Sequence, residues 1–219
     1  AIGIGALGSG SITTGADGSV AIGLNALTAI TSGAGNTAIG YQAADSVGTG
    51  ANNTIVGYNS LIEANTAANN NTTLGKGALQ NASSATNTGN IAIGSASLTG
   101  GSGALTGNIA IGQNALDDTT SNAQTGTIAI GHQALTALTS GAENIAIGYQ
   151  CMDAVDDGAE NIAIGYQAMS GETSGAQSIA IGSEALKIAN TTGAGTVGNI
   201  MIGHNNGIAI TTATRNTVV

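Results

Sequence analysis

The chain has 219 residues, with 36 glycines, no proline, phenylalanine or tryptophan, and only 7% charged residues. Its net charge is −9 with three basic residues, Lys76, Lys187 and Arg215, which argues against binding to nucleic acid phosphates or to anionic membrane surfaces. There is one cysteine and no apolar run long enough to span a bilayer, so we predict neither an internal disulfide framework nor a transmembrane helix.

A pentapeptide of the type Asn-Ile-Ala-Ile-Gly recurs along the whole chain. Its last residue is Gly3, Gly23, Gly40, Gly57, Gly75, Gly94, Gly112, Gly131, Gly148, Gly165, Gly182 or Gly203. Successive glycines are roughly 17 to 21 residues apart, a near-constant period that is typical of stacked-repeat proteins. We therefore predict one solenoid domain over residues 1–207, and we treat residues 208–219 as a separate terminal segment.

Each repeat predicts the same rung. Of the three residues before the glycine, the first is β-branched, the second is usually small and the third is aliphatic. This alternation has a period of two, which predicts a short strand with one buried face. The glycine allows a bend, and we expect a second short strand at the Ala-Leu pair that follows, then a variable loop. The fold class is an all-β parallel solenoid of about twelve rungs, which at one strand spacing per rung makes a rod roughly 55 Å long.

The repeats change in character along the chain. Rungs one to four, residues 1–65, have loops rich in glycine and serine, and rung five, around residues 69–76, is the least regular. Rungs six to eleven, residues 89–187, are the most regular. Rung twelve loses the Ala-Leu pair after Gly203, and the threonine-rich tail is a terminal strand, a cap or the start of a following segment.

The alternation also predicts which residues form the core. We expect the isoleucines directly before the glycines to fill the roll, namely Ile93, Ile111, Ile130, Ile147, Ile164 and Ile181. The alanines between the β-branched residues then face outward, and an outward row of alanine without charge is poor solvent surface. We therefore predict a threefold interface between chains at Ala110, Ala129, Ala146, Ala163 and Ala180.

Few residues suggest catalysis. Cys151 could act as a nucleophile with His132 or His204 as its base, but it occupies the column of small residues after the bend, which favours a buried filler. The two histidines lie four rungs apart, about 19 Å by strand spacing, in a column of mixed identity that is typical of a surface. We predict no catalytic residue, no cofactor and no enzyme activity.

One acidic cluster is a weak candidate for a metal site. It consists of Asp153, Asp156, Asp157 and Glu160, whose carboxylates suit a hard cation such as Ca²⁺. The spacing matches no EF-hand loop, so a solvated loop is the favoured interpretation. A further column, two residues after the glycine, is mostly amide and predicts a hydrogen-bonded ladder along the roll: Asn25, Gln42, Asn59, Asn114, Gln133, Gln150, Gln167 and Asn205.

The repeat of Asn-Ile-Ala-Ile-Gly followed two residues later by Ala-Leu resembles the head repeats of YadA-like trimeric autotransporter adhesins. The stretch Asn-Thr-Ala-Ile-Gly-Tyr-Gln-Ala at residues 36–43 also resembles repeats of bacteriophage tail fibres, particularly those of marine phages. The resemblance implies a left-handed parallel β-roll in which three chains form a rigid stalk or head that binds surfaces. The repeat of this chain is longer than that of the adhesin heads.

These observations lead to a functional expectation. We expect a non-enzymatic fibre, stalk or head domain for surface attachment, assembled as a homotrimer and located outside the cell, on a virion or a bacterial surface. Its receptor is unknown and would be a glycan or a protein. Two alternatives stay open: a subunit of a head-to-tail filament, since uncapped solenoid ends expose strand edges, and a monomeric ice- or ligand-binding solenoid. Ice binding is disfavoured because no column is threonine throughout.

Overall fold

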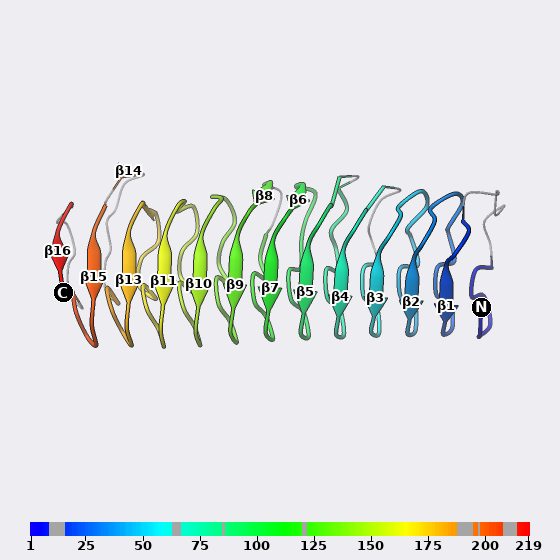
Figure 1. Ribbon diagram of the computed structural model, residues 1–219, viewed down its shortest axis with the longest axis horizontal. Coiled ribbons are helices and arrows are strands. Elements are labelled where there is room, and N and C mark those ends of the chain that lie inside the picture. The colour runs from blue at the N-terminus through cyan, green and yellow to red at the C-terminus, as the bar shows by residue number, and fades with distance from the viewer. Residues whose placement is uncertain are drawn as a thin grey trace.

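The structure is a computed structural model that describes residues 1–8, 16–62, 67–84, 86–119, 122–187, 195–196, 198–207 and 214–219. The described residues form an all-β parallel solenoid, as the repeat predicts. Its rungs follow one another along the long axis, with the N- and C-terminal ends at opposite ends of the roll (Figure 1). The described part of the chain has no helix long and apolar enough to cross a membrane.

One parallel sheet runs the length of the roll. Its strands, in spatial order, are β1 Val20–Ile22, β2 Thr37–Ile39, β3 Thr54–Val56, β4 Thr72–Leu74, β5 Ile91–Ile93, β7 Ile109–Ile111, β9 Ile128–Ile130, β10 Ile145–Ile147, β11 Ile162–Ile164, β13 Ile179–Ile181, β15 Ile200–Ile202 and β16 Thr217–Val218. Two further pairs lie outside this sheet: β6 Leu105–Thr106 with β8 Gln124–Thr125, and β12 Gly175–Ala176 with β14 Gly195–Thr196.

Equivalent positions of successive repeats pair with each other. Ile145 pairs with Ile162 and Ala146 with Ala163, and the same register holds along the sheet. Of the tail, residues 208–213 lie outside the described residues, but β16 pairs in parallel with β15, so the end of the tail is a further strand of the sheet. The first repeat contributes a single bridge, between Ile2 and Ile22.

The two faces of the strands are the reverse of our expectation. The middle residue of each three-residue strand is buried, and Ala146 has no exposed surface. The residues on either side of it are partly exposed, and Ile164 is 37% exposed. The prediction that Ile93, Ile111, Ile130, Ile147, Ile164 and Ile181 fill the core was wrong, because each is half-buried or exposed in the chain.

The predicted alanine interface was wrong for the same reason. Ala110, Ala129, Ala146, Ala163 and Ala180 are fully buried within the chain, where no second chain can reach them. Strand alternation identifies which residues share a face but does not say which face points inward. The opposite wall of the roll decides this, because its leucine and methionine column already fills the interior: Leu98, Leu116, Leu135, Met152, Met169 and Leu186 are fully buried. A narrow roll then has room only for small side chains from the strand.

The segment after each bend is a turn segment and not the second strand that we expected. Gln150 and Met152 have φ angles of 49° and 55°, in the left-handed region, and equivalent residues repeat this in the other rungs. Their backbone N–H groups bond to rungs on opposite sides. The N–H of Gln150 donates to the carbonyl of His132 in the preceding rung at 2.9 Å, and the N–H of Met152 donates to the carbonyl of Ala168 in the following rung at 2.9 Å. The turn segments therefore stack with their N–H groups hydrogen-bonded although they form no strand.

A buried asparagine ladder joins the corners that precede the strands. At its N-terminal end, the Oδ1 atom of one asparagine accepts two hydrogen bonds from the next: Asn53 donates to Asn36 through its backbone N–H at 3.0 Å and through Nδ2 at 2.9 Å. The pattern continues through Asn71, Asn90 and Asn108. A buried ladder whose asparagines hydrogen-bond one another fixes the register of the rungs.

The ladder is interrupted at Thr127. Its backbone N–H still donates to Asn108 at 3.0 Å, but among the described residues its buried Oγ1 and both side-chain polar atoms of Gln124 have no hydrogen-bond partner. We expect Thr127→Asn to raise the free energy of unfolding by about 1 kcal/mol, because the new Oδ1 can accept the N–H of Asn144 as Asn144 does for Asn161. Chemical denaturation measures this, with the exposed Thr125→Asn as control. Equal midpoints for the two variants would contradict the ladder argument.

Candidate functional site

The outward side of the long sheet is a continuous apolar surface, which we call the isoleucine face. It consists of the first and third residues of the regular strands: Ile91, Ile93, Ile109, Ile111, Ile128, Ile130, Ile145, Ile147, Ile162, Ile164, Ile179 and Ile181. Towards the N-terminus threonine takes the first position, at Thr37, Thr54 and Thr72. No first or third residue from β1 to β15 of this sheet is charged. Most of these isoleucines are half-buried and Ile164 is exposed, and a large partly exposed apolar surface of this kind is unusual for a monomer.

The bends carry two aromatic stacks, Tyr41 with Tyr58 and His132 with Tyr149 and Tyr166, which together we call the aromatic ridge. The rings of Tyr41 and Tyr58 stack with centroids 5.0 Å apart and planes 10° apart. Tyr149 stacks on His132 at 5.3 Å and on Tyr166 at 5.6 Å. The tyrosines are 39–50% exposed, so the ridge presents its ring edges and hydroxyls to solvent. The position directly after the glycine, which holds His132 and is of mixed identity along the chain, therefore forms ordered ring stacks where its residues are aromatic.

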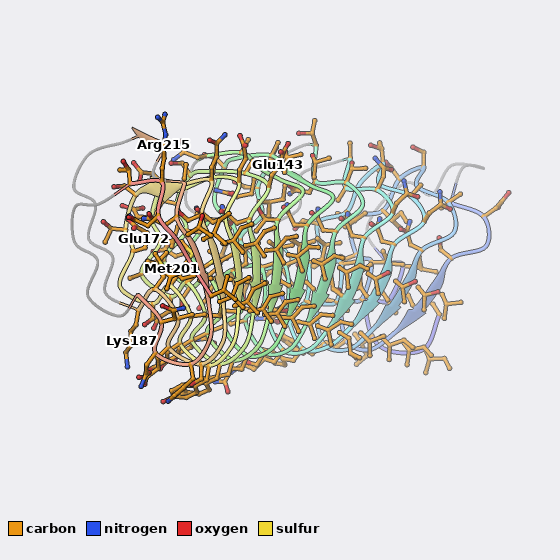
Figure 2. The ribbon with its side chains drawn as sticks, turned by 60° about the vertical axis from the view of Figure 1, so that its left-hand side comes forward. Glu143, Glu172, Lys187, Met201 and Arg215 are labelled. Carbon is orange, nitrogen blue, oxygen red and sulfur yellow. The ribbon has the colours of Figure 1, made fainter. Side chains whose placement is uncertain are left out.

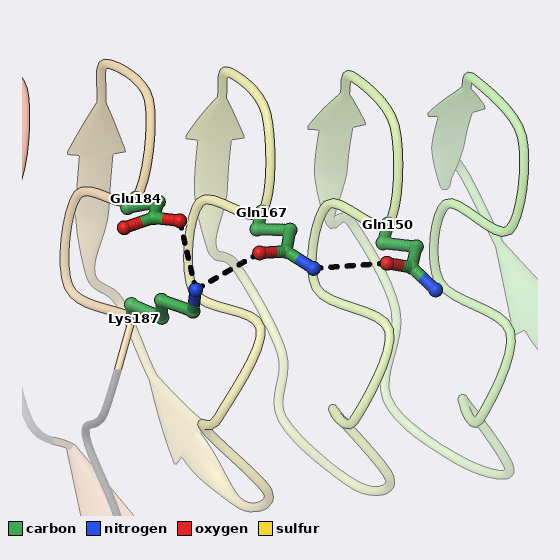
Figure 3. A network of polar contacts seen from close by, with 4 residues as sticks. All are labelled: Gln150, Gln167, Glu184 and Lys187. Carbon is green, nitrogen blue, oxygen red and sulfur yellow. Dashed lines mark hydrogen bonds and ion pairs between the residues drawn. The ribbon is translucent and has the colours of Figure 1, made fainter.

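Beside the ridge runs the amide ladder, made of Gln133, Gln150 and Gln167. Gln150 Nε2 donates to Gln133 Oε1 at 3.0 Å, and Gln167 Nε2 donates to Gln150 Oε1 at 2.9 Å. These contacts confirm the predicted ladder at these three positions. Lys187 closes the end of it, since Nζ donates to Gln167 Oε1 at 2.9 Å and pairs with Glu184 at 2.8 Å (Figure 3).

The amide ladder and the isoleucine face lie on opposite sides of the roll. The strand and the turn segment enclose the core between them, since Ser60 on a turn segment hydrogen-bonds Thr73 of β4 at 2.7 Å across it. Likewise Cys151 Sγ on a turn segment donates to the carbonyl of Ala163 in β11 at 3.2 Å. Outward residues of the two walls therefore face away from each other, and the aromatic ridge lies on the bend between them.

The basic residues do not gather into a patch. Figure 2 shows Lys187 and Arg215 on opposite edges of the roll near its C-terminal end. Lys76 is on the bend that follows β4, far along the sheet from both.

Cys151 is the small buried filler that its column predicts. It has no exposed surface, and its thiol donates to the backbone carbonyl of Ala163. Burial raises the pKa of the thiol to about 12, with a smaller contribution from the charge of Asp153, while backbone hydrogen bonds at Ile147 and Gly165 lower it. The geometry offers no histidine base: His132 stacks in the ridge, and His204 is exposed on the bend after β15.

We expect Cys151 to react very slowly with thiol reagents at pH 8. A pKa near 12 instead of 9 lowers the thiolate fraction on the order of a thousandfold. Because the folded-state pKa is raised, the associated stability is present below about pH 9 and is lost as the pH rises towards 12. Labelling followed by mass spectrometry, with the denatured chain as control, checks this. Rapid labelling of the native protein, or failure of Cys151→Ala to fold, would restore a functional role.

The acidic cluster does not assemble into a metal site. Within the described ranges no group of three or more His, Cys, Asp or Glu side chains gathers, and Asp153, Asp156, Asp157 and Glu160 are all described. Asp156 accepts a hydrogen bond from Thr139, and Glu160 Oε2 accepts one from Gln177 at 3.0 Å. Asp153 is half-buried, and desolvation raises the pKa of its carboxyl group.

Glu172 is a buried residue that the sequence analysis missed. It occupies the column of Leu138 and Val155, both fully buried, and is itself 1% exposed. Its Oε1 accepts the backbone N–H groups of Thr173 at 3.1 Å and Gly175 at 2.9 Å, so the turn that follows solvates the carboxylate. The signal that could have identified it is a carboxylate at the position where the two preceding repeats have Leu138 and Val155.

Comparison of the chain with protein-family models, with curated proteins and with solved structures gives no match in any of the three.

Proposed function

We propose that this chain is a non-enzymatic structural domain that assembles with copies of itself into a rigid extracellular rod for surface attachment. The observation that carries the proposal is the isoleucine face. It runs along the sheet from β5 to β13 with two isoleucines per strand and no charge. Leaving it in water would be costly, since burying apolar surface gains about 25 cal/mol per Å².

The chemistry of the face favours a second copy of the same chain as its partner. The face is a flat array repeated once per rung, and another copy carries the same array at the same spacing, so side chains can interdigitate along the whole length. The isoleucines of one chain then meet those of another, and the threonines of β2, β3 and β4 meet their equivalents when the chains run parallel. An interface of this length and composition resembles that of an obligate oligomer.

The number of copies that we propose is three. The resemblance to trimeric adhesin heads and tail fibres supports this stoichiometry, and a threefold axis allows one sheet face per chain to be shielded. The alanine columns play no part, because they are buried within each chain. A rod of this kind would belong to a virion tail fibre or a bacterial cell surface, where rigid stalks carry attachment sites.

The test is a charge variant of the isoleucine face. Ile147 and Ile164 lie one above the other at the third position of β10 and β11 and are partly exposed, so Ile147→Lys with Ile164→Lys should leave the fold intact. We expect the double variant to be a folded monomer, because three copies would each bring two uncompensated charges to the interface. Circular dichroism and sedimentation velocity report fold and assembly separately.

The matched control adds the same charges elsewhere. Ser95 and Gln113 are exposed on the bend column that contains Lys76 natively, so Ser95→Lys with Gln113→Lys should assemble as the unmodified chain does. If the isoleucine variant still forms the same oligomer as this control, the face is not the interface and the proposal fails.

A further inference from the structure

The aromatic ridge and the amide ladder together form a second surface that the proposed assembly does not use. Over the rungs of β9 to β11 it presents His132 with Gln133, Tyr149 with Gln150, and Tyr166 with Gln167, one aromatic and one amide per rung. We call these six residues the ridge–ladder strip. The amides are half-buried and face away from the isoleucine face, so covering that face leaves them as accessible as they are in the single chain.

The strip is ordered before any ligand binds. Each ring is held by a neighbouring ring at 5.3 or 5.6 Å, and each amide by hydrogen bonds of 2.9 or 3.0 Å. A primary amide has two N–H groups and an oxygen that accepts two hydrogen bonds. Within the ladder Gln150 uses one N–H group and one acceptor site of its oxygen. Its second N–H group and second acceptor site remain for a ligand. Fixed side chains lose little conformational entropy on binding, which favours affinity.

The spacing and charge of the strip restrict the ligand. Its groups recur once per rung, about 5 Å apart, whereas an extended peptide advances about 3.3 Å per residue and would fall out of step. The six residues of the strip include no lysine or arginine, the adjoining Lys187 is paired with Glu184, and the chain carries a net charge of −9, so nucleic acids and anionic polymers are disfavoured as ligands. A neutral sugar unit in an extended polysaccharide is close to one rung in length. It offers hydroxyls to amides and phenols and apolar C–H groups to aromatic edges.

We propose that the ridge–ladder strip binds an extended neutral polysaccharide, with one sugar unit per rung. Gln133, Gln150 and Gln167 exchange hydrogen bonds with the sugar hydroxyls, and the tyrosine rings contact the apolar parts of the same units. Weak contacts repeated at a fixed spacing add along the chain, so affinity should rise with the number of sugars. This inference deepens the proposed function and rests on it, since it names the surface and the ligand class through which the rod attaches.

The experiment titrates the full chain with neutral oligosaccharides and measures binding by calorimetry. The panel contains β-1,4-linked oligomers of glucose, of mannose and of N-acetylglucosamine, each from two to eight sugar units long. We expect binding to at least one series, with affinity that increases up to the length of the strip. The double variant Tyr149→Ala with Tyr166→Ala should weaken the affinity for the oligosaccharide about tenfold or more. The double variant Gln150→Ala with Gln167→Ala should weaken it to a similar extent. Tyr149→Phe with Tyr166→Phe keeps the rings and should lose less.

The control is Thr125→Ala with Asp118→Ala, two exposed residues away from the strip, which should bind as the unmodified chain does. Absence of binding across the panel, equal affinity in the strip variants, or preference for an extended peptide would overturn the inference. Sedimentation of the same samples separates it from the proposed assembly. A monomer that binds sugars contradicts only the assembly, and a trimer that binds none contradicts only the strip.

Discussion

Gly148→Ala is expected to destabilise the roll strongly, as are the same substitutions at the equivalent glycines of the other bends. A Cβ atom at this position would lie 2.2 Å from the carbonyl oxygen of Gly165 in the next rung, and φ is +142°, a conformation that residues with side chains rarely adopt. Because the contact is with backbone, no side chain can move to relieve it. We expect a loss of about 3 kcal/mol or more in the free energy of unfolding, measured by chemical denaturation.

Gly107→Ala is the matched control for this prediction. Gly107 also has a positive φ, +64°, but an added Cβ would meet nothing within 4 Å. Only the cost of the left-handed conformation applies there, about 1 kcal/mol. The difference between the two variants therefore isolates the close approach of the bends. Similar denaturation midpoints for Gly148→Ala and Gly107→Ala would show that the rungs are not stacked at the bends as described.

Ala146→Leu is expected to have the second largest effect. Ala146 is fully buried between Ala129 and Ala163 of the neighbouring strands, and it faces the filled leucine and methionine column across a narrow core. Overpacking a close-packed core typically costs about 1–3 kcal/mol, and we expect about 3 kcal/mol here because the rigid rungs above and below leave little room to relax. The denaturation midpoint and the protection of strand amides from hydrogen exchange are the measurements.

The same substitution at an exposed loop position provides the comparison. Ala123 is exposed, so Ala123→Leu should change the free energy of unfolding by no more than about 0.5 kcal/mol. Were Ala146→Leu tolerated equally well, alanine would not face the core, and the reversal of the two strand faces would be incorrect.

The sequence predicted the architecture of the rung well at its strand and its bend. The short strands, their parallel register and the glycine anchors all follow from a near-constant period and from strict residue types in each column. These are local features, repeated so often that each copy supports the others. The amide ladder at Gln133, Gln150 and Gln167 was predictable for the same reason, since equal residues stack at equal positions.

The orientation of the strand faces could not be obtained from periodicity. Isoleucine and alanine alternate in either orientation, and size preference alone favoured isoleucine inside. What decides is the opposite wall, whose residues reach inward from left-handed turn segments, at Met152 and its equivalents, instead of from a second strand. That conformation for non-glycine residues is not evident from the residue types. The stacking of Tyr149 on Tyr166 was missed because the column as a whole is mixed.

The central claim is that the isoleucine face joins copies of this chain, and sedimentation equilibrium of the unmodified protein tests it most directly. Measured from low micromolar concentration upward, the mass should correspond to three chains and should stay constant, because burial of so long an apolar face makes dissociation unfavourable. A mass of one chain throughout this range would contradict the claim and would leave the isoleucine face exposed to solvent in the native protein.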